Sequence, residues 1–168
     1  SRIDVLIERF YLIFSKKLIE DNLKNIYFLN YMKFYNVDGW GGTRNEDSIY
    51  IILRKEYSDD EIIEIMIEEF SSILFLKYKF DYKQWASFNL LDFEYSGDGI
   101  ELLDQDTLLF SNIDLWVKGF INKYAMSSIE NDFNQISRWL FIRYDKLIDI
   151  CNDYSLIKRK TEYAKEFY

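Results

Sequence analysis

The 168-residue chain contains no histidine, no proline and a single cysteine, Cys151. Without histidine, every nucleophile activated by an imidazole base is excluded, and so is every histidine-ligated zinc or haem site. A lone cysteine also excludes an internal disulfide, a zinc ribbon and CxxC redox chemistry. The sequence therefore lacks the side chains on which most familiar catalytic and metal sites depend.

Positive charge is scarce as well. The 21 lysines and arginines face 29 aspartates and glutamates, which gives a net charge of −8. Such a surface repels nucleic acid and anionic lipid, so we expect no nucleic-acid partner. The longest apolar stretches, such as 129–150, carry charges every few residues, whereas a membrane span needs about 20 apolar residues. We expect a soluble domain with no transmembrane segment.

Apolar residues make up 49% of the chain and aromatic residues 19%. A chain of this length can bury roughly 70% of the surface that it exposes when unfolded, which argues against disorder. No repeat, linker or low-complexity segment interrupts it, so we expect a single domain over 1–168 of class α+β, mostly helical with a small β-sheet. Charged amphipathic sequence follows Ser1 directly, which fits a cytoplasmic protein or an exported one whose signal has been removed.

Apolar residues at steps of three and four predict a helix over 3–20. Capping-box spacing at Ser58 and Glu61 predicts the start of a helix over 58–78. The same spacing at Ser127 and Glu130 predicts a long helix over 129–151. Shorter helices are expected over 81–88, 112–123 and 155–167.

Two short aromatic and β-branched runs, 25–30 and 48–53, predict strands. Between them, 36–45 holds three of the six glycines without a regular period, which predicts a loop or a hairpin tip. The segment 93–106 carries the turn signal Gly97-Asp98-Gly99 and predicts a long irregular crossing.

Glu69 departs from the helical pattern of its segment. It falls among Ile62, Ile65, Met66 and Ile73, on the apolar stripe of the predicted helix, whereas Glu68 and Ser72 fall on a neighbouring polar stripe. An unpaired carboxylate is costly on such a stripe and is often protonated or paired. We therefore take Glu69 as a candidate site residue.

The helix segment Ile67-Glu-Glu-Phe-Ser-Ser-Ile-Leu74 resembles the zinc-binding helix of the gluzincin-like metallopeptidases found as envelope lipoproteins in Bacteroidetes, which are distantly similar to the catalytic domain of anthrax lethal factor. That helix reads His-Glu-x-x-His in phrases such as HHEFAHIL, and some relatives read HHEFSSIL. About 50 residues on, 119–133 reads GFINKYAMSSIENDF and resembles the family's GFxxxYAxSxxxEDF block. The aromatic segment that follows the zinc helix also has counterparts here, namely Phe80, Trp85, Asn89, Phe93 and Tyr95. The resemblance spans roughly residues 23–150.

Two histidines at i and i+4 can share a zinc ion on one helix face, while the Glu between them deprotonates the metal-bound water. The resemblance aligns the two histidines with Glu68 and Ser72 and the later Glu ligand with Asn131. It aligns the general base with Glu69 and an oxyanion-stabilising tyrosine with Tyr124, so these two residue types are kept. All three zinc ligands are replaced, and a Glu, Ser and Asn set does not bind zinc tightly.

The resemblance thus implies a zincin-like fold and a catalytically inactive protein without metal or cofactor. It implies a binding or scaffolding role at the bacterial cell envelope, in the periplasm or as an outer-membrane lipoprotein. The implied partner is an outer-membrane nutrient-import complex or a peptide or glycan ligand. Glu69 is then expected at the floor of a cleft, paired with Tyr124 or a serine hydroxyl.

Two alternatives stay open. One is a hydrolase that uses Glu69 and Glu68 as an acid–base pair, although adjacent helix positions diverge by about 100°. The other is an unrelated acidic interaction domain that binds through exposed aromatic residues such as Trp40, Trp85 and Trp116.

Overall fold

The computed structural model describes residues 1–34, 37–39, 41–97 and 111–168. The chain forms two compact units, Ser1–Tyr78 and Lys79–Tyr168. It is mostly helical with a small three-stranded sheet, which confirms the expected α+β class. The single metallopeptidase-like domain expected over 1–168 concerns both units together and stays a prediction.

The first unit begins with two helices, α1 (Arg2–Ile13) and α2 (Lys16–Asn22), where the sequence predicted one. The break falls at Phe14, whose backbone is extended at φ −109° and ψ 152°. The Ser15 side chain then accepts a hydrogen bond from the Leu18 amide and caps α2. The apolar period continues across the break because Phe14 and Ile19 both reach the core.

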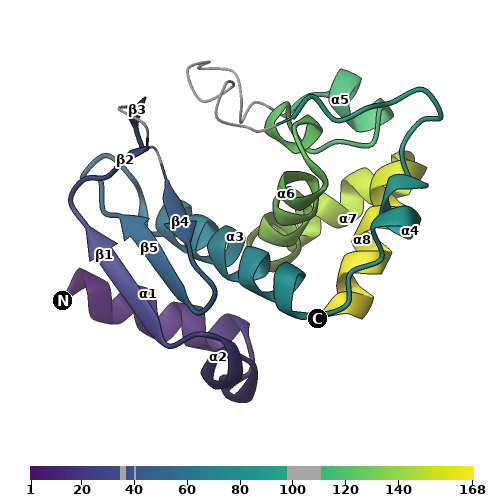
Figure 1. Ribbon diagram of the computed structural model, residues 1–168. Coiled ribbons are helices and arrows are strands. Elements are labelled where there is room, and N and C mark those ends of the chain that lie inside the picture. Colours follow the sequence, from purple (N-terminus) through teal and green to yellow (C-terminus); the bar gives the residue numbers. More distant parts are fainter. Residues whose placement is uncertain (35–36, 40, 98–110) are drawn as a thin grey trace. The chain divides into compact units, whose positions relative to one another are not determined.

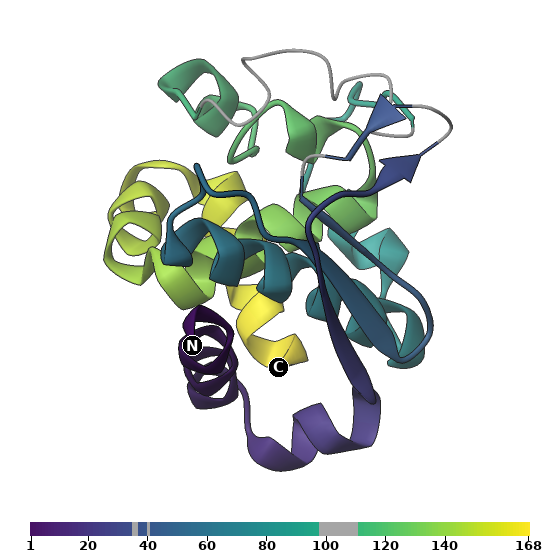
Figure 2. The same ribbon diagram turned by 90° about the vertical axis from the view of Figure 1, so that its left-hand side faces the viewer.

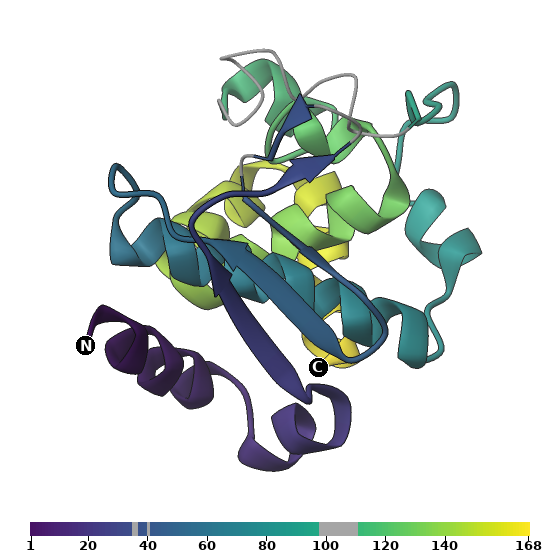
Figure 3. The same cartoon turned by 60° about the vertical axis from the view of Figure 1, so that its left-hand side comes forward.

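Strands β1 (Asn25–Leu29) and β5 (Ser48–Ile52) confirm the two predicted strands and pair in parallel. Strand β4 (Gly42–Arg44) pairs antiparallel on the other side of β5, so the order is β1-β5-β4 (Figure 3). The prediction of a loop or a hairpin tip over 36–45 is therefore wrong for 37–38 and 42–44, which are strands, and residues 36 and 40 lie outside the described residues. Strands β2 (Lys33–Phe34) and β3 (Val37–Asp38) form a separate antiparallel pair.

Helix α3 (Asp59–Lys77) starts as predicted, with a capping box between Ser58 and Glu61. Helices α1 and α3 cover the same face of the three-stranded sheet (Figures 1 and 2). Between the helices, the Phe70 ring lies edge-on to Phe10 and Phe14, with centroids 5.6 and 5.0 Å away. These ring contacts hold α1 and α3 together.

The second unit holds six described helical segments. They are α4 (Tyr82–Ala86), α5 (Ile113–Val117), the 3₁₀ turn η2 (Tyr124–Met126), α6 (Ile129–Ile142), α7 (Tyr144–Asp153) and α8 (Ser155–Phe167). Helix α4 confirms the short helix predicted over 81–88, and α8 confirms the last one. The irregular crossing predicted over 93–106 lies partly outside the described residues.

Two predicted helices of this unit are shorter than expected. The helix expected over 112–123 ends before Gly119, which has a positive φ of +88°. The helix expected over 129–151 breaks into α6 and α7 at Arg143, at φ −125° and ψ 39°. The predicted cap at Ser127 is also wrong, because Ser128 caps α6 by accepting from the Asn131 amide.

An aromatic cluster forms the core of the second unit. The Phe80 ring lies 5.2 to 5.9 Å from those of Trp85, Phe133, Tyr163 and Phe167. Trp85 is fully buried, so the expectation that it is an exposed aromatic is wrong. Trp40 lies outside the described residues.

Candidate functional site

Helix α3 carries Glu68, Glu69 and Ser72, the first group of predicted site residues. Glu68 and Glu69 are half-buried, and Ser72 is buried. Glu64, one turn before Glu68 on the same face of α3, is also buried. The polar face of α3 is therefore not uniformly solvated, because Glu64 and Ser72 are buried whereas Glu61 is exposed.

Strand β4 crosses α3 at Glu69. A methyl group added to the Cα of Gly42 would lie 3.0 Å from Glu69 Cγ and 3.0 Å from Ile65 Cγ2. It would also lie 2.8 Å from the Tyr50 carbonyl oxygen. Glycine is needed at this position because strand and helix approach each other too closely for a side chain between them.

The backbone of β4 has one side turned to β5 and one side turned away. The Asn45 amide donates to the Ser48 carbonyl (3.0 Å), and the Ile52 amide donates to the Gly41 carbonyl (2.9 Å). Because antiparallel ladders alternate, Gly41, Thr43 and Asn45 turn their backbone groups to β5, while Gly42 and Arg44 turn theirs away. Within the described parts of the chain, no strand pairs with that outer side of β4.

Tyr124 and Asn131, the second group of predicted site residues, lie together in the second unit. The Ser127 hydroxyl donates to the Tyr124 carbonyl oxygen at 2.7 Å and accepts from Asn131 Nδ2 at 2.8 Å. Both residues are half-buried. Asn131 thus uses its amide to hold η2 against the start of α6.

The predicted site residues fall in both units: Glu68, Glu69 and Ser72 in the first, Tyr124 and Asn131 in the second. That the two groups share one cleft stays a prediction, as does the pairing of Glu69 with Tyr124.

The side chains at the three ligand positions do not fit zinc. Structural and catalytic zinc sites use thiolate, imidazole and carboxylate ligands, and here one carboxylate is joined by a hydroxyl and an amide. Among the residues that the structure describes, no group of three or more Asp, Glu, Cys or His side chains is placed to hold a metal ion.

A buried ionic centre in the second unit was not anticipated from the sequence. Lys160 Nζ on α8 lies 2.7 Å from Asp132 Oδ2 on α6, and neither side chain is exposed to solvent. The same carboxylate oxygen accepts hydrogen bonds from Trp85 Nε1 (2.9 Å) and the Tyr95 hydroxyl (2.7 Å). Asn89 Nδ2 donates in turn to the Tyr95 hydroxyl at 2.9 Å.

Burial governs the protonation of this centre. Loss of hydration raises the pKa of Asp132 and lowers the pKa of Lys160, and the ion pair opposes both shifts. Burial, followed by the charge of Asp132, raises the pKa of Tyr95 well above its ordinary value. Because solvent does not reach Asp132 or Lys160, the centre has the character of a structural element.

The motif that carries the family resemblance supplies much of this centre. Lys160 Nζ donates to the Gly119 carbonyl oxygen at 2.8 Å and lies 3.9 Å from the centroid of the Phe120 ring. Asp132 and Phe133 end the same motif, and Phe133 is buried in the aromatic core. These residues of the motif therefore have packing roles. Asn131, at the position aligned with a zinc ligand, instead donates its side-chain amide to Ser127.

The lone cysteine does not supply a nucleophile. Cys151 is buried, and its thiol donates to Thr161 Oγ1 at 3.4 Å. Burial raises the pKa of this thiol, which disfavours the reactive thiolate.

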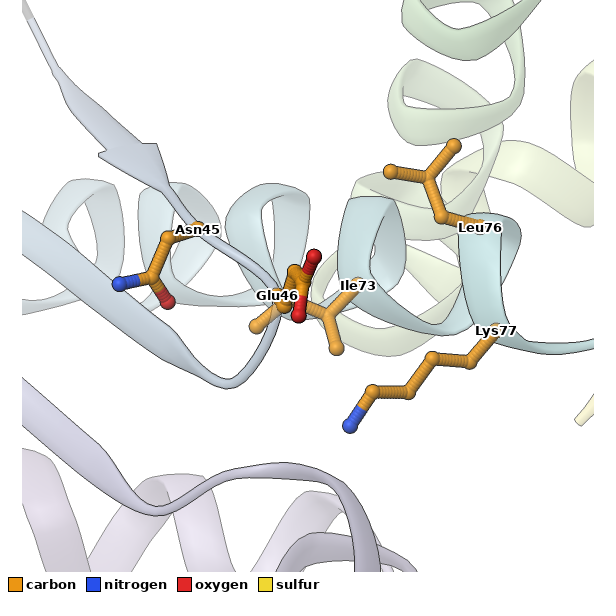
Figure 4. Close-up of a pocket in the computed structure, with 5 residues that line it drawn as sticks. All are labelled: Asn45, Glu46, Ile73, Leu76 and Lys77. Carbon is orange, nitrogen blue, oxygen red and sulfur yellow. The ribbon is translucent and has the colours of Figure 1, made fainter.

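Two surface pockets are lined by other residues. One of about 290 Å³ lies in the first unit, between the end of α3 and the β4–β5 turn (Figure 4). Its lining residues are Asn45, Glu46, Ile73, Leu76 and Lys77. Figure 4 shows Leu76 and Lys77 leaving α3 in different directions. Lys77 Nζ donates a hydrogen bond to the Asn22 carbonyl oxygen at 3.1 Å.

The other pocket, of about 360 Å³, lies in the second unit beside α5 and α7. It is lined by Ile113, Trp116, Lys146, Asp149, Ile150, Asp153 and Tyr154. The Trp116 and Tyr154 rings meet edge to face with centroids 5.7 Å apart. Of the three tryptophans proposed for binding, Trp116 lines this pocket.

No family model, curated protein or solved structure matches the chain. Within the described ranges, no helix is both long and apolar enough to cross a membrane.

Proposed function

We propose that the chain is a metal-free, catalytically inactive relative of the gluzincin-like metallopeptidases that binds an extended peptide along β4, beside Glu69. The crossing of β4 over α3 carries this proposal. It supports a peptide site because the outer side of β4 pairs with no described strand, and an extended peptide can add to such an edge through main-chain hydrogen bonds.

The loss of catalysis follows from the residues at the three zinc-ligand positions, which are Glu68, Ser72 and Asn131. Without a zinc ion, a bound water molecule keeps a pKa far above neutrality, so Glu69 has no activated water to deprotonate. Glu68 and Glu69 do not form an acid–base pair in place of the metal. Adjacent residues on a helix point about 100° apart, so the two carboxylates do not lie on either side of one substrate bond. Peptide binding along β4 does not require zinc-dependent hydrolysis and can therefore remain without it.

The cellular setting of this proposal rests on the resemblance alone. A place at the bacterial cell envelope, beside an outer-membrane nutrient-import complex, fits a binding or scaffolding module of this family. A glycan is the other ligand that the resemblance suggests.

Restoring the ligands tests the proposal. We expect the wild-type chain to show no stoichiometric zinc binding in calorimetry. The variant Glu68→His/Ser72→His/Asn131→Glu is expected to bind one zinc ion at least about a thousandfold more tightly than wild type, because it rebuilds a two-His, one-carboxylate site. Since Ser72 is buried, a parallel variant with the smaller Ser72→Cys guards against a failure to fold, which circular dichroism would report.

The matched control is the variant Glu68→His/Ser72→His, which keeps Asn131 and is expected to bind zinc more weakly than the triple variant. Tight zinc binding by the wild type would refute the metal-free proposal. Folded triple variants that gain no affinity over the double variants would refute the metallopeptidase-like arrangement of the five positions.

One observation favours a second function. Trp116 and Tyr154 line a pocket together with Asp149 and Asp153, which fits an acidic interaction domain that binds through aromatic residues. Loss of peptide binding in Trp116→Ala, together with unchanged binding in Arg44→Pro, would favour this alternative.

A further inference from the structure

Strand β1 forms the other edge of the three-stranded sheet. It pairs with β5 on one side, and within the described residues no strand pairs with its other side. Figure 2 shows β1 at the front of its sheet, with no other ribbon of the first unit in front of it. The strand reads Asn-Ile-Tyr-Phe-Leu and is half-buried or exposed along its whole length.

This edge lacks the features that usually protect an exposed strand from pairing. Natural edges are kept short, carry charges or contain proline or a bulge. Strand β1 has five residues, no charge and no proline.

The backbone groups that β1 turns outward can be identified from the ladder. The Leu53 amide donates to the Leu29 carbonyl at 2.8 Å, so Leu29 turns its backbone groups to β5. Alternation assigns the same direction to Asn25 and Tyr27, and it turns the amides and carbonyls of Ile26 and Phe28 to the unpaired edge.

These outward groups are self-complementary. We propose that β1 pairs antiparallel with β1 of a second copy of this chain, about a two-fold axis through Tyr27. Ile26 of each copy then lies opposite Phe28 of the other, and each such pair exchanges two main-chain hydrogen bonds. The result is one continuous sheet in the order β4-β5-β1-β1-β5-β4.

The side chains and charges of β1 fit the same axis. Tyr27 is 43% exposed, and its ring stacks on Tyr50 at 4.9 Å with an interplanar angle of 13°. The axis places the two Tyr27 residues at the closely spaced, non-hydrogen-bonded position, where they extend the tyrosine stack across the junction. The paired residues 25–29 carry no charge, and the axis places Lys24 of one copy opposite the neutral Asn30 of the other. Two chains that each carry −8 therefore meet without opposing like charges.

The size of the contact limits its strength. A five-residue strand buries much less than the roughly 800 Å² per partner of a standard interface, so the dimer is weak and reversible. A second copy of the chain presents an uncharged strand that matches this edge. An unrelated peptide would match it only if its own sequence were similarly uncharged.

Sedimentation equilibrium of the full chain tests this pairing. From about 5 μM to about 300 μM, a range that reveals weak association, we expect the average mass to rise from 20.5 kDa towards twice that value. Tyr27→Lys is expected to remain monomeric throughout, because it sets two positive charges against each other at the axis. Tyr27→Phe is expected to associate as the wild type does.

Tyr11→Lys is the matched control. Tyr11 is 40% exposed on α1, so the same change of residue at similar exposure is expected to leave association unchanged. Hydrogen exchange gives a second readout, since the Ile26 and Phe28 amides gain protection with concentration. A wild type that stays at 20.5 kDa, or a folded Tyr27→Lys variant that associates like the wild type, overturns the proposal.

Discussion

Asp132 on α6 and Lys160 on α8 form an ion pair of 2.7 Å that is closed to solvent on both sides. Lys160 also binds the carbonyl oxygen of Gly119, and Asp132 also binds the indole of Trp85 on α4. One buried pair thus connects two helices, the segment before η2 and the aromatic core. Buried charges of this kind are tolerated only when paired and hydrogen-bonded.

Removing one partner of this pair is expected to be costly. Lys160→Met leaves the Asp132 carboxylate buried without its cation, and Asp132→Asn leaves the Lys160 ammonium without its anion. Each should lower the free energy of unfolding by about 3–5 kcal/mol. Urea unfolding followed by tryptophan fluorescence measures the loss, because Trp85, Trp116 and Trp139 report on the second unit.

The exposed Lys158 of the same helix supplies the control. Lys158→Met should change the free energy of unfolding by less than about 0.5 kcal/mol, as surface substitutions usually do. The double variant Asp132→Leu/Lys160→Met should lose less than either single variant, because it removes both buried charges. Equal losses at positions 158 and 160 would contradict a structural role for the pair.

Tyr95 should make the protein less stable in alkali. Its folded pKa is raised above the ordinary value of 10.0 because burial and the Asp132 charge disfavour the phenolate. Above pH 10 the unfolded chain therefore releases a proton that the folded chain retains, and the free energy of unfolding falls as the pH rises.

Tyr95→Phe removes this dependence. Compared with the variant, the wild type should lose up to about 1.4 kcal/mol more stability per pH unit above pH 10 and show no such difference below pH 9. Urea unfolding of both proteins between pH 8 and pH 11 measures the two slopes. Parallel slopes would mean that Tyr95 ionises in the folded state as freely as in the unfolded one.

Gly119 should tolerate alanine poorly. Its φ is +88°, and an added methyl group would lie 2.9 Å from Leu156 Cβ on α8. We expect Gly119→Ala to cost about 2–4 kcal/mol, from backbone strain of about 1–2 kcal/mol together with steric overlap. Gly97→Ala separates the two effects, because Gly97 has φ +106° with no atom within 4 Å of the added methyl group. A smaller loss at position 97 than at 119, measured by urea unfolding, would isolate the overlap with α8.

The elements with strong local signals were predictable from sequence. The capping box at Ser58 and the β-branched run over 48–53 depend on neighbouring residues, and the structure has α3 and β5 at those places. The break of the first predicted helix was missed although Ser15 is a good cap, because Phe14 and Ile19 keep the apolar period on both sides.

The missed features depend on contacts between distant residues. Gly42 has the local character of a turn residue, and only the approach of β4 to Glu69 explains a glycine within a strand. Lys160 lies in the charged run Lys158-Arg-Lys160, which predicts a solvated helix face, and its burial depends on Asp132 far along the chain. Local pattern carries no information about such partners.

Peptide binding along β4 should depend on the main chain of Arg44. Its amide points away from β5, so Arg44→Pro removes one outward donor and leaves the β4–β5 ladder intact. With a pool of tryptic peptides from casein as the probe, we expect the wild type to gain hydrogen-exchange protection at the outward Gly42 amide and Arg44→Pro to lose most of it. Arg44→Ala, which keeps the amide but removes the guanidinium, should retain most of the protection. If Arg44→Ala loses the protection as fully as Arg44→Pro, the side chain and not the strand edge binds the peptide, and the proposed strand addition is wrong.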